Sequence, residues 1–250
     1  MDSTLDMDFI LATNNAHKLK EFENALGGRV FRAQDFGIYD FNPIEDGNSF
    51  EDNARIKALA LYEALRDLDS LESKKTFPKK LVILADDSGL CVEALGGMPG
   101  IFSARYANLD SNIKSSENSS DSDNRERLKT ELLKRDLWGS KAYFQCSIAY
   151  IFCDSIKSIL DSKAVKVVNG ICDGIVSIKM VGNQGFGYDS MFYKNIDSNK
   201  IDFSIKNTDK ILENLTNSLA TLSLNEKMQI SHRGNALKKL KEELESTLRN

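Results

Sequence analysis

Residues 84–90 read Leu84-Ala85-Asp86-Asp87-Ser88-Gly89-Leu90, and this stretch decides the fold. The apolar run 81–85 predicts a short buried strand that ends in two carboxylates, a hydroxyl and a glycine. In open α/β sheets, ligands bind at the carboxyl ends of strands. Two carboxylates there favour a hard cation, because unpaired negative charges are costly to hold together. The alternative is an ordinary polar turn of Asp, Ser and Gly, and this stretch alone leaves both open.

Around this stretch, the sequence pattern alternates strands with helices. Residues 9–12 predict a strand, the polar turn Thr13-Asn14-Asn15 can cap a helix, and apolar residues recur at helical spacing over 16–26. Polar segments near 66–80, 108–124 and 195–221 look like flexible surface insertions, the last with a weak helix of its own. The pattern indicates a mixed α/β fold. Further helices are predicted near 49–65, 125–137 and 231–250, a strand at 142–152, a hairpin of 164–168 and 171–178 around Asn169-Gly170, and a short strand at 191–193.

Length and composition exclude several classes of protein. The 250 residues suffice for one large domain or two small lobes that share a core. A net charge of −4 gives no general electrostatic case for binding a nucleic-acid polymer or an anionic membrane. The four cysteines form no Cys-x-x-Cys pair and there are two histidines, so we expect reduced thiols rather than a Cys/His zinc site or a disulfide scaffold.

The amino terminus and the hydropathy pattern favour the cytoplasm. Residues Met1–Asp8 carry three aspartates and no basic segment, which does not match a secretory signal. No apolar run is long enough to span a bilayer. We therefore expect a cytoplasmic protein without a membrane partner.

Two segments carry residues suited to phosphate and metal. Thr13 to Lys18 lies between a strand and a helix amino terminus, where backbone N–H groups favour a phosphate and Lys18 adds a positive charge. The segment lacks the glycines of a P-loop, and a capped helix with a surface lysine is the simpler alternative. Glu45 is a candidate metal ligand and Lys57 a candidate phosphate contact. Alternatively, Glu45 favours a helix amino terminus, and Lys57 reaches solvent past a packed face.

Two further segments are suited to a flat ring or a carbonyl group. Phe186-Gly187-Tyr188-Asp189 combines aromatic surface, backbone freedom and a carboxylate, so a purine can stack there. Ser231-His232-Arg233-Gly234 opens the last helix with two side chains that donate to a carbonyl oxygen or a phosphate, and Lys227 lies just before it. The alternatives are a glycine-rich turn with packing aromatics and a capped helix start.

The order of these segments resembles that of the inosine triphosphate pyrophosphatase family, which hydrolyses deaminated purine nucleoside triphosphates. The matching blocks follow the family's order across nearly the whole chain. The Asp-Asp-Ser-Gly-Leu and Ser-His-Arg-Gly blocks are each specific. The full set of matching blocks is LATNNAHKLKE, EDGNSFEDNARIKA, ADDSGLCVEALGGMPGIFSARY, GFGYD and EKMQISHRGNALKKL.

The resemblance implies hydrolysis of ITP, dITP and XTP to the monophosphate and pyrophosphate, with Mg²⁺ as the cofactor and a homodimer as the assembly. It implies a single domain over 1–250, elongated and two-lobed, in which helices flank a long twisted mixed sheet and the active site occupies a cleft between the lobes. Asp87 is the implied catalytic base, and Glu45 and Asp87 are the implied metal ligands. The implied substrate contacts are Thr13, Asn14, Asn15, Lys18, Lys57, Ser88, Phe186, Gly187, Tyr188, Asp189, Lys227, His232 and Arg233, of which the last two meet the oxygen-bearing edge of the purine.

Two positions depart from the family pattern, and other functions stay open. Asn14 replaces the usual glycine, at little cost if that position needs a positive φ, and Ser190 replaces a proline. The alternatives are a pyrophosphatase for other modified nucleotides and a non-catalytic nucleotide-binding protein. A haloacid-dehalogenase-type phosphatase fits less well, because Asp86 and Asp87 are adjacent rather than alternate.

Overall fold

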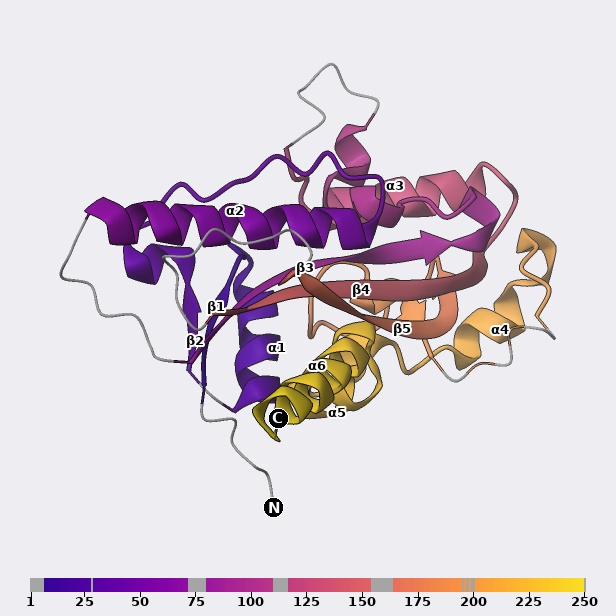
Figure 1. Ribbon diagram of the computed structural model, residues 1–250. Coiled ribbons are helices and arrows are strands. Elements are labelled where there is room, and N and C mark those ends of the chain that lie inside the picture. Colours follow the sequence, from indigo (N-terminus) through magenta and orange to yellow (C-terminus); the bar gives the residue numbers. More distant parts are fainter. Residues whose placement is uncertain are drawn as a thin grey trace. The chain divides into compact units, whose positions relative to one another are not determined.

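The computed structural model describes residues 7–27, 29–71, 80–109, 117–153, 164–194, 196, 198 and 201–249. Its strands form a six-stranded sheet in the order β2-β1-β3-β4-β5-β6 (Figure 1). β1 pairs in parallel with β2 and β3, whereas β5 and β6 are antiparallel, so the predicted mixed α/β class is confirmed. The strands are β1 (Asp8–Leu11), β2 (Val30–Arg32), β3 (Leu81–Val92), β4 (Gly139–Cys153), β5 (Lys166–Ser177) and β6 (Phe192–Tyr193).

The α-helices begin where the sequence supplies capping groups. The side chain of Asn15 accepts hydrogen bonds from the backbone N–H groups of residues 17 and 18, and Gly27, at φ 66°, ends the first helix. Ser223 and Glu226 form a capping box before the fifth. No helix in the described part of the chain is long and apolar enough to cross a membrane. The helices are α1 (Ala16–Leu26), α2 (Phe50–Leu71), α3 (Asp121–Leu133), α4 (Asp209–Asn214), α5 (Leu224–Ile230) and α6 (His232–Arg249).

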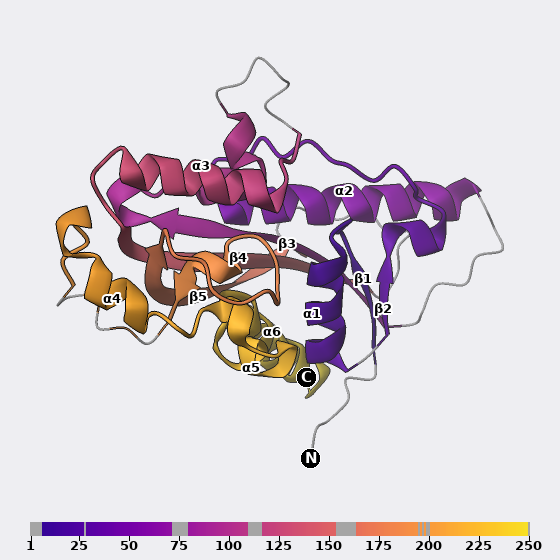
Figure 2. The ribbon, with the colours of Figure 1, turned by 180° about the vertical axis from the view of Figure 1, so that it is seen from behind.

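The chain divides into two compact units. The first contains the chain up to Asp87, together with Cys146–Gly170 and Arg233–Asn250. In this unit, α2 covers one face of the strands and α1 and α6 cover the other (Figure 1, Figure 2). The apolar face of α2, from Ala54 to Leu65, packs on buried side chains of β1, β3 and β4. This packing fixes which residues of α2 lie over the strands.

The second unit contains Ser88–Gln145 and Ile171–His232. Leu128 and Leu132 of α3 pack in one core with residues of β3, β4, β5 and β6. A smaller core gathers around the fully buried Trp138 and includes Leu212 of α4. The glycine-rich segment 96–100 turns the chain, with positive φ at its three glycines.

The strand predicted at 81–85 is longer than expected, and the predicted turn after it is wrong. β3 runs unbroken from Leu81 to Val92, and Gly89 has no positive φ with which to turn the chain. The polar residues 86–88 are tolerated inside a buried strand because side chains from the helices pair with the carboxylates. The candidate carboxylates therefore lie in the middle of a strand rather than at its carboxyl end.

The predicted hairpin around Asn169-Gly170 is also wrong, because β5 is one strand from Lys166 to Ser177. A type I′ turn requires positive φ at both central residues, and neither has it. Instead, the Asn169 side chain accepts a hydrogen bond of 2.6 Å from Ser147 of β4, and its backbone carbonyl accepts one of 2.7 Å from Lys239. These two hydrogen bonds hold Asn169 within the sheet rather than in a turn.

All three predicted insertions are partly helical. α2 continues to Leu71, and residues 72–79 lie outside the described residues. α3 begins at Asp121 rather than Arg125, because Ser120 caps it by accepting from the backbone N–H of residue 123 at 3.1 Å. Residues 110–116 lie outside the described residues as well. The weak helix predicted within 195–221 is α4.

Candidate active site

Asp86 and Asp87 point to opposite faces of β3, because successive side chains of a strand alternate. Asp86 meets Lys18 of α1 and Arg233 of α6. Asp87 meets Asn53 and Lys57 of α2. The sequence suggested that both neighbouring carboxylates bind one cation. In the structure, each carboxylate has its own cationic partners instead.

The Asp87 side of the first unit brings together residues that lie far apart in the sequence. The Lys57 ammonium lies 3.2 Å from Asp87 Oδ1 and 3.1 Å from Glu45 Oε2. Asn53 donates to Asp87 Oδ2 at 3.2 Å, and its own side-chain oxygen accepts from the backbone N–H of Gly47 at 2.9 Å. Two carboxylates thus share one buried ammonium, and Asn53 ties the loop before α2 to the strand.

Burial sets the charge behaviour of this cluster. Burial raises the pKa of Asp87 above its ordinary value, although the positive charge of Lys57 opposes the shift. For Lys57, burial opposes the charged form, but Asp87 and Glu45 outweigh it and raise the pKa of the ammonium. Lys57 therefore stays charged, and Asp87 is a stronger proton acceptor than an exposed aspartate.

The donor set of this cluster fits a hard divalent cation. Glu45 and Asp87 place carboxylate oxygens within 3.2 Å of a common positive charge. Among the described residues, no group of three His, Cys, Asp or Glu is suited to hold a metal. Mg²⁺ in proteins is bound by one or two carboxylates together with substrate phosphates. The arrangement suits a metal that shares its coordination with a phosphate.

The loop before α1 is held by its own side chains. Thr13 Oγ1 accepts from the backbone N–H of Asn15 at 3.1 Å, and Asn14 Nδ2 donates to the carbonyl of Phe41 at 3.0 Å. Asn14 has no positive φ, so the glycine usual in the family is not required for this backbone conformation. Lys18, in the first turn of α1, lies 3.0 Å from Asp86 Oδ1.

Arg233 is buried in the first unit, with 1% of its side chain exposed. Its guanidinium donates to Asp86 Oδ2 at 3.0 and 3.2 Å and also bonds Glu21 of α1. These contacts give Arg233 a structural role, and its predicted contact with a purine stays a prediction.

The Phe186–Asp189 loop of the second unit is built around Lys227. The Lys227 ammonium lies 2.7 Å from Asp189 Oδ2 and 4.8 Å from the centre of the Phe186 ring, a cation–π geometry. Asp189 Oδ2 also accepts from the backbone N–H of Phe186 at 2.9 Å. Three predicted residues are therefore held in one buried cluster that presents an aromatic ring.

Helix α3 clamps the middle of the same loop. Asp121 accepts from the backbone N–H of Gly187 at 2.6 Å, and Arg125 donates to its carbonyl at 2.7 Å. Gly187 has φ 59°, a conformation that costs glycine little. The Tyr188 hydroxyl donates to the carbonyl of Ser103 at 2.9 Å. Both peptide groups of the glycine are thereby fixed from a helix outside the loop.

His232 and Ser88 complete the predicted set in the second unit. The His232 ring stacks on Phe144, with centres 4.7 Å apart and planes 12° apart. Ser88 follows Asp87 in β3 and is half-buried. Stacking fixes the plane in which the imidazole can exchange hydrogen bonds.

Sequence reasoning missed the partners that hold the site together. Asp86 and Glu21 pair with predicted residues, and Asp121 and Arg125 hold Gly187. Two signals were available in the sequence. Asn53 lies beside the apolar face of α2, where a polar group needs a partner, and Ser120 with Asp123 matches a helix start.

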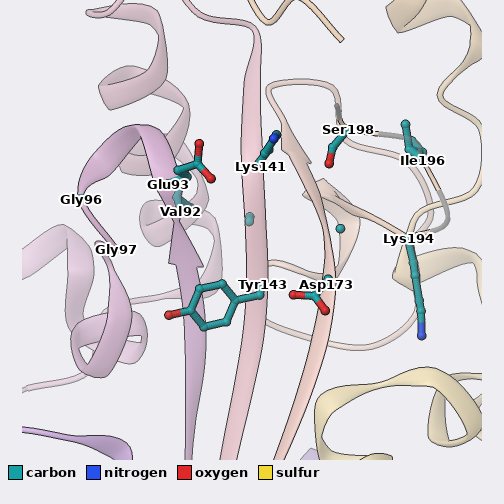
Figure 3. Close-up of a pocket in the computed structure, with 12 residues that line it drawn as sticks. Val92, Glu93, Gly96, Gly97, Lys141, Tyr143, Asp173, Lys194, Ile196 and Ser198 are labelled. Atoms are coloured by element: carbon teal, nitrogen blue, oxygen red, sulfur yellow. The ribbon is translucent and has the colours of Figure 1, made fainter. Parts of the chain in front are cut away.

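One pocket of the second unit contains none of the predicted residues. It has a volume of 680 Å³, and its walls include Glu93, Lys141, Tyr143, Asp173 and Lys194 (Figure 3). Two acidic and two basic side chains line it, so it offers no strong charge for a triphosphate. The pocket geometry therefore does not locate the chemistry, which the ionised clusters indicate instead.

Comparison with known proteins identifies relatives over nearly the whole length. Residues 9–243 match the model of the Ham1 family. A dITP/XTP pyrophosphatase of Staphylococcus epidermidis is 33% identical over 95% of this chain and 96% of its own length. One of Campylobacter jejuni is 35% identical over 92% and 94%. The solved structure of the Staphylococcus aureus Ham1 protein is 32% identical, with a TM-score of 0.66 over 96% of this chain and 99% of that one.

Proposed function

This chain belongs to the Ham1 family, and we propose that it hydrolyses deaminated purine nucleoside triphosphates, ITP, dITP and XTP, to the monophosphate and pyrophosphate. It is a nucleoside triphosphate pyrophosphatase, a hydrolase that acts on the α–β phosphoanhydride. The predicted family, reaction and enzyme class agree with the family model and with the relatives. Removing such nucleotides keeps them out of the pool from which nucleic acids are made.

The observation that carries the proposal is the buried cluster of Lys57 with Glu45 and Asp87. A phosphoryl-transfer site needs positive charge for the phosphate oxygens, carboxylates for a metal and a group that positions the attacking water. We assign Lys57 and Lys18 to the phosphates, and Thr13, Asn14 and Asn15 to the loop that borders them. Glu45 and Asp87 would hold Mg²⁺, which supplies charge neutralisation on the phosphate oxygens when bound.

Asp87 is assigned as the base. Water attacks the α-phosphorus, Asp87 accepts its proton, and the α–β bridging oxygen leaves with pyrophosphate. The pKa of Asp87, raised by burial, suits this task, because a base is most effective when its pKa approaches the working pH. Lys18 and Lys57 offset the charge that spreads over the phosphate oxygens in the transition state.

Base recognition is assigned to residues of the second unit together with Arg233. We propose that Phe186 stacks on the purine, Lys227 and Asp189 hold that ring in place, and Gly187, Tyr188 and Ser88 contact the nucleotide. His232 and Arg233 would donate to the carbonyl oxygen at purine position 6, where adenine has an amine. A donor left facing that amine loses its partner, which is the physical basis for rejecting ATP.

Identification of the products tests the proposed reaction. Phosphorus NMR of ITP incubated with the protein and Mg²⁺ is expected to show IMP and pyrophosphate in equal amounts. Inosine diphosphate with inorganic phosphate would contradict attack at the α-phosphorus.

His232→Phe is expected to narrow the preference for ITP over ATP by about tenfold or more, the effect of losing one hydrogen bond to a buried donor. Phenylalanine keeps the ring that stacks on Phe144 and removes the ring nitrogens. The measurement is kcat/KM for both nucleotides. A ratio equal to that of the wild type would refute the role of His232 at the purine edge.

Arg125→Met is expected to raise the KM for ITP about tenfold with a smaller effect on kcat, because it removes a charged hydrogen bond to Gly187. The loop that carries Phe186 then loses part of its support. Lys129→Met is the matched control, since Lys129 lies on the same helix in an exposed pair with Glu126. Equal KM values for the two variants would show that the clamp does not serve binding.

Further parts of the proposal come from the resemblance. We propose one catalytic domain over 1–250, a homodimer and a cytoplasmic location. All four cysteines are buried and none lies in a disulfide, which agrees with the expected thiols. Light scattering of the purified protein measures the mass of the assembly, and a monomer would overturn the dimer. A pyrophosphatase for other modified nucleotides is the second candidate, and a kcat/KM higher for a modified pyrimidine triphosphate than for ITP would favour it.

A further inference from the structure

Asp86 is a buried carboxylate that has no role in the proposed reaction. It lies in β3 beside the proposed base but on the other face of the strand, with 1% of its surface exposed. Its Oδ1 lies 3.0 Å from the Lys18 ammonium. Its Oδ2 accepts from Arg233 at 3.0 and 3.2 Å and receives the Cys146 thiol at 3.8 Å. Each carboxylate oxygen thus has its own cation.

The two cations come from different helices of the first unit. Lys18 belongs to the first turn of α1 and keeps 16% of its side chain exposed, whereas Arg233 opens α6 and is 1% exposed. Glu21, one turn after Lys18, also bonds Arg233. Lys18 and Arg233 therefore share Asp86 as a common partner.

Burial opposes a charge on Asp86, and the Lys18 ammonium and the Arg233 guanidinium, one on each carboxylate oxygen, compensate it. The negative charge of Asp86 holds the Lys18 ammonium in one position. Lysine needs such a partner because its side chain is flexible and its ammonium has no preferred direction of its own.

We propose that Asp86 is a positioning residue that holds Lys18 in place for the phosphates of the substrate and anchors Arg233 beside it. The inference rests on the proposed function. Asp86 touches no reacting atom and acts through the two cations. A single carboxylate thereby links a phosphate contact to the Ser-His-Arg-Gly block. The pair Asp86-Asp87 thus divides its work between the faces of one strand, with positioning on one face and chemistry on the other.

A double-mutant cycle between Asp86 and Lys18 tests the proposal. Asp86→Asn keeps the shape and removes the charge, and it is expected to lower kcat/KM for ITP about 10²-fold, the cost typical of a misplaced contact. Lys18→Met should cause a similar or larger loss. Because Asp86 acts on the phosphates through Lys18, Asp86→Asn should cost less than about tenfold in the Lys18→Met background, and that remainder runs through Arg233. If the loss in kcat/KM of the double variant equals the product of the two single losses, Asp86 acts independently of Lys18 and the proposal fails.

Controls separate positioning from general stability. Asp8→Asn removes a carboxylate that pairs with Arg29 at 2.6 and 2.7 Å in the same unit, and it should leave kcat/KM unchanged. If Asp86→Asn does not fold, Asp86→Glu replaces it, since that variant keeps the charge and shifts it by one methylene. The loss in kcat/KM caused by Asp86→Glu must also become smaller in the Lys18→Met background. Independent losses in that cycle would overturn the proposal equally.

A binding measurement keeps this inference distinct from the proposed reaction. Calorimetry with inorganic tripolyphosphate and Mg²⁺ is run on the wild type and the same variants. We expect weaker binding in Asp86→Asn and Lys18→Met and no further loss in the double variant. If the wild type binds tripolyphosphate but hydrolyses no nucleotide, the proposed function fails and the binding cycle alone decides the role of Asp86. If Asp86→Asn binds as tightly as the wild type, the positioning role is refuted.

Discussion

Asp87→Asn is expected to lower kcat for ITP by about 10²–10⁴-fold, the range associated with loss of a general base. The amide has the shape of the carboxylate but accepts no proton at neutral pH, and it replaces one of the two carboxylates proposed for the metal with a neutral oxygen donor. Steady-state release of pyrophosphate measures the effect. The thermal unfolding midpoint should stay close to that of the wild type, since burial already raises the pKa of Asp87 and so disfavours its charged form.

The matched control for this prediction is Asp46→Asn. Asp46 follows Glu45 and is exposed, so the variant changes the net charge by the same amount without touching the buried cluster. It should retain nearly full activity. Turnover by Asp87→Asn at more than a tenth of the wild-type rate would remove Asp87 from the role of base.

Arg233→Met is expected to destabilise the fold by roughly 3–5 kcal/mol, the cost of leaving buried charges without their partner. Asp86 and Glu21 would both lose the guanidinium that neutralises them. For a chain of this size, the loss corresponds to a fall in Tm of roughly 6–20 °C. Differential scanning calorimetry measures it directly.

Two comparisons show whether the buried charges cause this loss. Arg29→Met removes an arginine with the same two-point contact to an aspartate, but Arg29 is 73% exposed, so its Tm should hardly change. Adding Glu21→Gln to Arg233→Met should recover part of the lost Tm, because one buried charge is then removed. A Tm of Arg233→Met equal to that of the wild type would show that the network contributes no stability. The purine contact would then be the one role left for Arg233.

Local sequence signals predicted the helices well, because capping is a short-range interaction. Asn15, Ser49 and Ser223 each accept a backbone N–H at the start of a helix, as their side chains predict. The strands were harder to delimit. Polar residues at 86–89 and the Asn169-Gly170 pair resemble turns, yet both lie inside strands that neighbouring strands and helices stabilise. Tertiary partners override such local preferences, and a sequence does not reveal those partners.

The candidate site shows the same division. Residues carrying chemistry stand in recognisable blocks, so Glu45, Lys57 and Asp87 could be named from the sequence, and they meet within 3.2 Å. The residues that hold them come from elsewhere in the chain. Glu21 and Asp121 look like ordinary charges of helix surfaces, and their roles depend on which backbone or guanidinium group lies opposite. Period-two alternation in a strand would have separated Asp86 from Asp87, had residues 86–89 been recognised as strand.

The most direct test of the central claim is pyrophosphate release from ITP, dITP, XTP, ATP and GTP, each with Mg²⁺ and with a chelator. The account predicts rapid release from ITP, dITP and XTP, little from ATP and GTP, and none when the chelator is present. Release from ATP and GTP at rates equal to those from ITP would contradict the proposed recognition of the purine edge. Release from none of the five, by protein shown to be folded, would contradict the reaction itself.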